Sequence, residues 1–271
     1  MLKYHSEPNQ GLQGLGVTAP LAAMHYANTN FGLIGAAYDS QVEYRKQTVA
    51  DVGDRPSLAT IDLVNSESGF VNNSVQDVLA KRKSAEEYVA SCLVASRFLP
   101  MLACALLRTN GRPGRRPYPS GGALYSIEPV FFVRNVHSLD AGLYVVDNSR
   151  MHLKLLQRDS GGLIETVFGT CLYPDHIQNA AAVCFLIANF SKSAAKYGER
   201  SYRLALLEAG HISQNLLLAA TANDIGCRPV CGFEEVEVNN LLGLNGFDHG
   251  VVEGITFGVI ADSQEYVSDG R

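Results

Sequence analysis

The chain has 271 residues, of which 46% are hydrophobic and 18% are charged, and its formal net charge is −5. This length allows one large domain or two small ones, and the composition is that of a globular protein, which argues against intrinsic disorder. The acidic balance disfavours nucleic-acid binding as the main activity, because phosphate neutralisation needs a broad basic surface.

Neither export nor membrane insertion is expected. The first ten residues, MLKYHSEPNQ, contain no apolar signal segment, and no apolar run approaches the length of a membrane span. The six cysteines are scattered along the chain, which fits free thiols in a reducing cytosol. Cys227 and Cys231 lack the second ligand pair that a structural zinc site needs, so we expect a cytoplasmic protein without a metal.

The N-terminal part is the hardest to interpret. Residues 1–75 are rich in Gly, Asn, Ser and Thr and show weak hydrophobic periodicity, although TIDLV (60–64) is typical of a short strand. We interpret residues 1–75 as an extension that docks a partner or contributes dimer contacts, and residues 76–271 as the main domain.

A helix is predicted over residues 75–108. Ser84 and Glu87 have the spacing of a capping box, in which each side chain bonds the backbone amide of the other residue. A run rich in Ala, Leu and Val follows. Pro100 interrupts this run, so we expect a kink or two helices.

The remaining elements mix strands and helices. The density of Gly and Pro in residues 109–122 predicts a loop. Uninterrupted apolar runs predict strands, and stretches crowded with Leu and Ala predict helices. The predicted strands cover residues 128–133, 142–147, 153–157, 182–190, 227–233 and 251–260, and the predicted helices cover 163–169, 200–224 and 234–242. Regular β-α-β alternation is missing, which favours the α+β class.

An arginine cluster lies in and beside the predicted loop. Its members are Arg108, Arg112, Arg115 and Arg116. Guanidinium groups suit phosphate because they donate paired hydrogen bonds and stay charged. The hydroxyl of Ser120 and the backbone amides of Gly121 and Gly122 add donors that an anion can approach closely. Taken alone, the loop is either a solvated basic surface or a cradle for a phosphorylated cofactor.

Two further groups of polar residues lie on and just before the longest predicted helix. On that helix Glu208, His211 and Asn215 share one face, with Gln214 close by. Because the other positions are nearly all apolar, we expect these side chains to bond either the protein's own backbone or a polar ligand. Lys196-Tyr197 precedes the helix, and an ammonium beside a phenol favours the phenolate, which suits proton transfer.

These segments together resemble one family. RRPYPSGGALYSIEP (115–129), YRLALLEAGHISQNLLLAATANDIG (202–226), CGF (231–233) and LLGLNG (241–246) occur in the order and spacing of FMN-dependent dehydrogenases of the nitroreductase superfamily. Within that superfamily the chain resembles the azoline dehydrogenases, which include the dehydrogenase subunits of microcin-type and streptolysin-type thiazole/oxazole synthetases. The resemblance covers residues 76–260 and extends faintly to RPSLATIDL (55–63).

The resemblance implies a fold and a set of cofactor contacts. The expected fold is α+β, with a central, mostly antiparallel sheet flanked by helices and an obligate homodimer that holds FMN at its interface. Arg82 and Ser84 look like the family's Arg-x-Ser element for the FMN phosphate, and Arg228 is expected to reach the same group. The implied FMN-binding residues are Arg82, Ser84, Arg115, Arg116, Pro119, Ser120, Gly121, Gly122, Ala123, Gln214, Asn215, Gly226 and Arg228.

The resemblance also implies an activity and partners. Lys196 and Tyr197 match the family's lysine-tyrosine pair, which is tied to the oxidation of azoline rings to thiazoles and oxazoles in ribosomally made peptides. Expected partners are a cyclodehydratase and a precursor peptide, in a bacterial cytoplasm. The alternatives are an NAD(P)H-dependent nitro- or quinone reductase, an inactive scaffold subunit, or an α+β domain that merely carries a basic loop. Ser126 departs from the family, which has proline there, and predicts a changed entry into the next strand.

Overall fold

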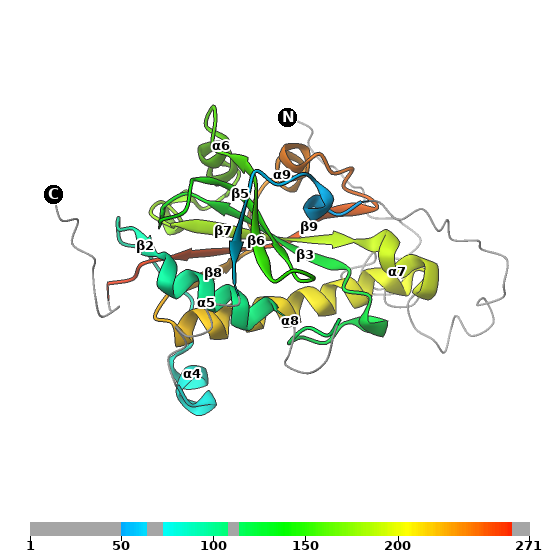
Figure 1. Ribbon diagram of the computed structural model, residues 1–271, viewed down its shortest axis with the longest axis horizontal. Coiled ribbons are helices and arrows are strands. Elements are labelled where there is room, and N and C mark those ends of the chain that lie inside the picture. The colour runs from blue at the N-terminus through cyan, green and yellow to red at the C-terminus, as the bar shows by residue number, and fades with distance from the viewer. Residues whose placement is uncertain (1–49, 64–72, 108–113, 262–271) are drawn as a thin grey trace, which may run out of the picture.

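A seven-stranded sheet forms the centre of the computed structural model, which describes residues 50–63, 73–107 and 114–261 (Figure 1). The strand order is β1-β6-β5-β3-β7-β9-β8, and every neighbouring pair is antiparallel. The strands are β1 (Ala59–Asp62), β3 (Ile127–Val133), β5 (Gly142–Asp147), β6 (His152–Arg158), β7 (Ala182–Asn189), β8 (Gly226–Val230) and β9 (His249–Gly258). The predicted α+β class and the predicted strands after residue 127 are confirmed.

Helices cover both faces of this sheet. α5 and α8 lie against one face, and α6 and α9 lie against the other (Figure 1). Successive residues of β3 serve both layers: Phe131 packs with the α5–α8 layer, whereas Val130 and Phe132 pack with the α6–α9 layer. The helices are α5 (Ala95–Leu106), α6 (Leu163–Gly169), α8 (Arg200–Ala222) and α9 (Glu235–Leu242). The central strands β3 and β7 are therefore buried on both sides, which explains their continuous apolar sequences.

The predicted helix over residues 75–108 is wrong in its middle. α4 (Val75–Lys81) ends before Ser84, and α5 begins only at Ala95, so the two helices are separated by non-helical chain. Ser84 and Glu87 therefore form no capping box. Pro100 lies inside α5 and does not mark the break.

Pairing with the far edge of the sheet explains this break. The backbone amide of Ala85 donates to the carbonyl of Cys227 at 2.9 Å, and that of Val89 donates to the carbonyl of Val259 at 2.8 Å. Between them the buried hydroxyl of Tyr88 lies 2.8 Å from Thr256 Oγ1. These contacts satisfy the backbone without helical bonds, so tertiary structure overrides a local helix propensity.

A helix absent from the sequence prediction follows β7 without a connecting loop. α7 (Phe190–Tyr197) takes up the stretch that was predicted as the end of a strand and a loop. It ends at Gly198, whose φ of 51° lies in the left-handed region. Lys196 and Tyr197 occupy the last turn of this helix. The short elements that remain are β2 (Leu93–Val94) and β4 (Val136–His137), which pair in parallel, and the 3-10 turns η1 (Val52–Asp54), η3 (Gly121–Ala123) and η4 (Pro174–His176).

Residues 50–63, which fall in the predicted N-terminal extension, are built into the main body. The strand predicted at 60–64 is present as β1, which pairs with β6 at the edge of the sheet. η1 bonds the side chain of Glu128 in β3 through two backbone amides. Residues 1–49 lie outside the described residues. In the described part of the chain, no helix has the length and apolar character needed to cross a membrane.

Candidate active site

The Ser-Gly-Gly turn after the arginine-rich loop lies against the Lys196-Tyr197 pair. Gly122 has a φ of +64°, and a Cβ built there would lie 2.5 Å from Tyr197 Oη and 2.9 Å from Lys196 Nζ. Ala123 and Tyr125 also have positive φ, at 55° and 51°. Such angles are costly outside glycine and persist only where surrounding contacts impose them. The structure thus brings two distant sequence motifs into one place.

Glu208 of α8 holds this turn. Its side chain is 2% exposed. Ser120 Oγ donates to Glu208 Oε2 at 2.6 Å, and the backbone amide of Ile127 donates to Glu208 Oε1 at 3.1 Å. Ser126 donates to Oε2 through both its backbone amide (3.3 Å) and its hydroxyl (3.2 Å). A carboxylate only accepts, and it can take four donors, so one buried side chain fixes both ends of the turn.

The polar face of α8 bonds the protein's own backbone. Asn215 Nδ2 donates to the carbonyl of Pro117 at 3.1 Å, and His211 Nδ1 lies 3.3 Å from the carbonyl oxygen of Pro119. Of the two alternatives for this face, bonding to the backbone is the one the structure shows for these two side chains. Gln214 is exposed on the same helix.

Arg116 is the half-buried member of the arginine cluster. Its guanidinium carbon lies 4.4 Å from the ring centroid of Tyr125, and its Nη1 donates to Tyr118 Oη at 2.8 Å. Burial raises the pKa of Tyr118 to about 12, so this phenol stays neutral and can accept that bond. No carboxylate of the described residues forms an ion pair with Arg116, which leaves guanidinium donors for a ligand. Arg115 is exposed, and Arg108 and Arg112 lie outside the described residues.

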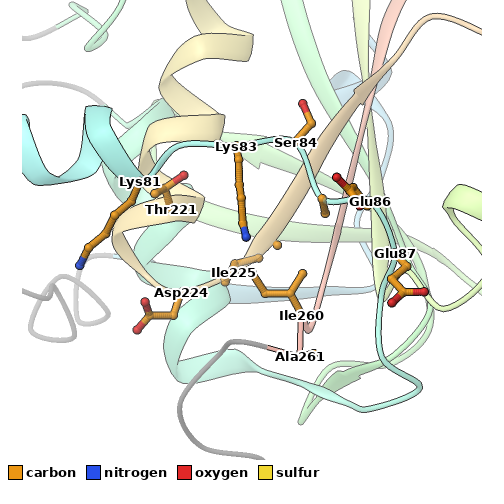
Figure 2. A pocket seen from close by; sticks show the side chains of 12 residues that line it. Lys81, Lys83, Ser84, Glu86, Glu87, Thr221, Asp224, Ile225, Ile260 and Ala261 are labelled. Atoms are coloured by element: carbon orange, nitrogen blue, oxygen red, sulfur yellow. The ribbon is translucent and has the colours of Figure 1, made fainter.

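A second group of the predicted cofactor residues lies at the other end of α8. Lys83, Ser84, Ile225 and Gly226 line a cavity of about 570 Å³, and Figure 2 shows the Lys83 side chain extending towards Ile225. Lys81 adds another cation, whereas Glu86, Glu87 and Asp224 add carboxylates, so the charge of the lining is mixed.

Two predicted residues beside this cavity already have structural contacts. Arg228 Nη1 donates to the carbonyl of Ala85 at 2.9 Å. A Cβ on Gly226 would lie 2.3 Å from a methyl carbon of Ile260, so the glycine is required by packing. Burial raises the pKa of Cys227 to about 11, and the charge of the half-buried Arg82 partly opposes this rise.

The two groups of predicted cofactor residues do not meet within one chain. Glu208, which holds the turn, and Thr221, which lines the cavity, are separated along α8 by about 20 Å at the rise of an α-helix. Figure 1 shows the same separation, with α7 at one end of α8 and α4 at the other. Within one chain the predicted cofactor residues therefore form two separate groups.

A charge cluster sits at the start of α7. Asp51 accepts a bond from Asn189 Nδ2 at 2.9 Å and is bonded by the ammonium of Lys192. Ligand atoms of Asp51, Glu128 and His249 lie within 4.8 Å of one another, which is a spacing that a metal ion can use. Because the Lys192 ammonium already bonds Asp51, we infer that this cation supplies the positive charge of the cluster.

Glu128 makes stability depend on pH. Burial, followed by the nearby Asp51 charge, raises the pKa of Glu128 to about 7 from its ordinary 4.5. The folded state then binds this proton more tightly than the unfolded chain, so the contribution is complete below about pH 4.5 and is lost as pH rises through 7. The lost contribution to the free energy of unfolding approaches about 3 kcal/mol.

We expect urea unfolding to show that the free energy of unfolding falls between pH 5 and 8, with a clearly smaller fall in Glu128→Gln. An identical dependence on pH in the two proteins would contradict an origin in Glu128.

Sequence reasoning singled out Glu208 on its helix but missed its role, and it missed the Glu128 cluster. The available signal for Glu208 was a carboxylate within an otherwise apolar helix, which demands partners. For Glu128 there was none, because its partners Val52 and Gly53 come from a segment without clear periodicity.

Residues 79–259 match the family described as the nitroreductase family, and the match covers more than half of the chain, so the protein belongs to that family. The fold is that of a nitroreductase-like oxidoreductase domain. Among the curated relatives is a Methanocaldococcus jannaschii protein provisionally named nitroreductase MJ1384. It is 30% identical over 169 residues, which cover 62% of this chain and 83% of the relative.

Two further similarities point to one branch of the family. The microcin B17-processing protein McbC of Escherichia coli is 34% identical over 145 residues, which cover 48% of this chain and 49% of McbC. The E. coli microcin synthetase McbBCD complex with truncated pro-MccB17 bound contains a chain that superposes with a TM-score of 0.60. That superposition covers 91% of this chain and 98% of the other at 21% identity, which shows a shared fold. The sequence match reaches only about half the length of McbC.

Proposed function

We propose that this protein is an FMN-dependent azoline dehydrogenase, which oxidises thiazoline or oxazoline rings of a ribosomally made peptide to thiazoles or oxazoles. The observation that carries the proposal is the meeting of Gly122 with Lys196 and Tyr197, since a Cβ at Gly122 would lie within 3 Å of both polar side-chain ends. A turn suited to holding a cofactor thereby adjoins a pair suited to handling a proton. The similarity to McbC supports this branch of the family.

The residues present fit FMN. At one of these two groups of residues, Arg116 keeps donors without a carboxylate partner in the described chain, and the glycines of the turn let backbone amides approach a ligand closely. At the other, Lys81 and Lys83 line a cavity of about 570 Å³ and suit an anionic phosphate group. FMN would be held by the turn at its ring end and by Arg82, Ser84 and Arg228 at its phosphate end.

Two copies of the chain are needed to assemble this site. On α8 the side chains of Tyr202, Leu206 and Leu207 are 44%, 41% and 55% exposed, and Gly210 beside them has open space at its Cβ position. Such an apolar stripe on a helix suits burial against a second copy. If two α8 helices cross antiparallel near Gly210 and Gln214, the turn of one chain approaches the cavity of its partner. We therefore propose a homodimer with a twofold axis at α8.

The reaction removes a hydride and a proton from the azoline ring. When bound, FMN supplies the hydride acceptor. Lys196 and Tyr197 serve as the proton-handling pair: Lys196 Nζ lies 5.2 Å from the ring centroid of Tyr197, at the last turn of α7. The proton leaving the ring carbon is taken by the member of the pair that acts as the base, which is either Tyr197 Oη as a phenolate or Lys196 Nζ as a neutral amine. The other member donates a hydrogen bond to that base and orients it.

A relative seen in a complex supports a proposal about partners. The McbBCD complex is a microcin synthetase with a truncated precursor bound, so we propose that this chain also works with cyclodehydratase subunits and a precursor peptide. We propose that it acts with them in the bacterial cytoplasm.

The relative named nitroreductase favours a second candidate, an NAD(P)H-dependent nitro- or quinone reductase on the same scaffold. One set of assays separates the candidates. The purified protein is expected to show flavin absorption and to remove two hydrogens from an azoline-containing peptide, seen by mass spectrometry. Rapid reduction of a nitroaromatic by NADPH without any change in the peptide would support the reductase. A colourless protein that cannot be reconstituted with FMN would support an inactive scaffold subunit.

A further inference from the structure

The Ser120–Tyr125 turn depends on a single buried side chain. Four donors reach Glu208: the hydroxyls of Ser120 and Ser126 and the backbone amides of Ser126 and Ile127. Ser120 Oγ also accepts the amide of Tyr125 at 2.9 Å. Glu208 thus reaches the start of the turn directly and the left-handed residue Tyr125 through Ser120.

We propose that Glu208 is a positioning residue for the active site, and that its carboxylate form is required because two backbone amides point at different oxygens. The Ser126 amide donates to Oε2, and the Ile127 amide donates to Oε1. The kinetic test of this proposal rests on the proposed function, whereas the structural test does not.

Glutamine cannot replace this carboxylate. The two hydroxyls that reach Glu208 can rotate and accept instead of donating, but a backbone N–H can only donate. Whichever way the amide of a Glu208→Gln side chain is turned, its NH2 group faces either the Ser126 amide or the Ile127 amide. A buried N–H then loses its acceptor, which costs far more than the loss of a hydroxyl bond to the same oxygen.

The same contacts give Ser126 a role. Its backbone amide and its hydroxyl both donate to Glu208 Oε2. The azoline dehydrogenases that the chain resembles have proline at this position, and proline lacks both donors. In this chain the entry into β3 is therefore tied to α8 more tightly than a proline would allow.

The consequence for catalysis passes through Gly122. This residue lies between the anchored Ser120 and Ser126, and Tyr197 Oη and Lys196 Nζ lie close to where its Cβ would be. When the anchor is lost, the turn relaxes from its positive φ angles and Gly122 moves away from the pair. Glu208 touches none of the proposed reacting groups, so its effect is on their placement.

Glu253 offers a matched control. It is also a glutamate beside α8, but among the described residues it accepts one hydrogen bond, from Ser213 Oγ at 2.8 Å, and that hydroxyl can adapt to a glutamine. Glu253→Gln and Glu208→Gln therefore make the same chemical change, and only the second leaves a backbone amide without an acceptor.

Hydrogen exchange measured by mass spectrometry on the homodimer tests the anchor without any assay of activity. Glu208→Gln is expected to speed exchange in the segment 118–132 by roughly 10- to 100-fold, with Ser126→Ala less than about threefold and Glu253→Gln unchanged there. Unchanged exchange in Glu208→Gln, or equal acceleration in Glu253→Gln, would overturn the proposal.

Kinetics on an azoline peptide form the second arm. For Glu208→Gln we expect kcat to fall by about tenfold or more with KM within about twofold, because substrate binding is kept while the proton-handling pair is misplaced. A rise in KM with an unchanged kcat would refute a positioning role. If the wild-type protein proves inactive on azolines, the proposed function fails, and the exchange data still decide whether Glu208 anchors the turn.

Discussion

Replacing Lys196 by alanine or Tyr197 by phenylalanine is expected to leave FMN bound and to reduce azole formation by about 100-fold or more, the usual contribution of a positioned acid-base group. Both side chains end beside Gly122, where we propose that the substrate ring meets the cofactor. The measurement is the rate of a 2 Da mass loss from an azoline peptide, together with the absorption spectrum of each variant. Tyr173→Phe is the control, because Tyr173 is exposed and its ring lies against Gly232, which is in neither the turn nor the Lys196-Tyr197 pair.

Full turnover by both variants would remove Lys196 and Tyr197 from the mechanism. Loss of the flavin spectrum in either variant would instead assign that residue to cofactor binding.

Gly122→Ala is expected to reduce azole formation by displacing Lys196 and Tyr197. A methyl group at this position would lie 2.5 Å from Tyr197 Oη and 2.9 Å from Lys196 Nζ, so both side chains must move. Displacement of catalytic groups by about 1 Å can cost about 100-fold in rate. The positive φ adds a stability cost of roughly 1 kcal/mol.

Gly161→Ala separates these two effects. Gly161 has a φ of +82° and nothing within 4 Å of its Cβ position, so the substitution adds strain without a collision. We expect both variants to lower the melting temperature by similar amounts, and only Gly122→Ala to lose turnover. Equal turnover in the two variants would show that the contact between Gly122 and the Lys-Tyr pair has no role.

The sequence predicted the elements whose signal is local. α8 and the central strands β3 and β7 are dense in apolar residues, and the structure confirms them. The prediction of a helix across Ser84 is wrong because the backbone amides of Ala85 and Val89 bond the carbonyls of Cys227 and Val259. No local sequence pattern indicates such pairing. α7 was missed because SKSAAKY offers too few apolar positions to reveal a helical period.

The candidate site was predictable in its parts and not in its arrangement. Ser120, Gly122, Lys196 and Tyr197 were each identified from motifs, but only the fold shows that they adjoin. The role of Glu208 and the donors of Ser126 depend on the register between α8 and the entry to β3, which sequence spacing does not define. The separation of the turn from the cavity along α8 likewise needed the structure.

Mixing two inactive variants tests the central claim, that flavin-dependent azoline oxidation occurs at a site shared by two chains. One parent is Lys196→Ala, and the other is Arg82→Ala with Arg228→Ala, which we expect to lose FMN. Refolding them together at equal amounts makes half of the dimers mixed, and each mixed dimer has one intact site. The account predicts about a quarter of wild-type azole formation, without added flavin. Activity no higher than that of the parents would place the whole site within one chain and contradict the account.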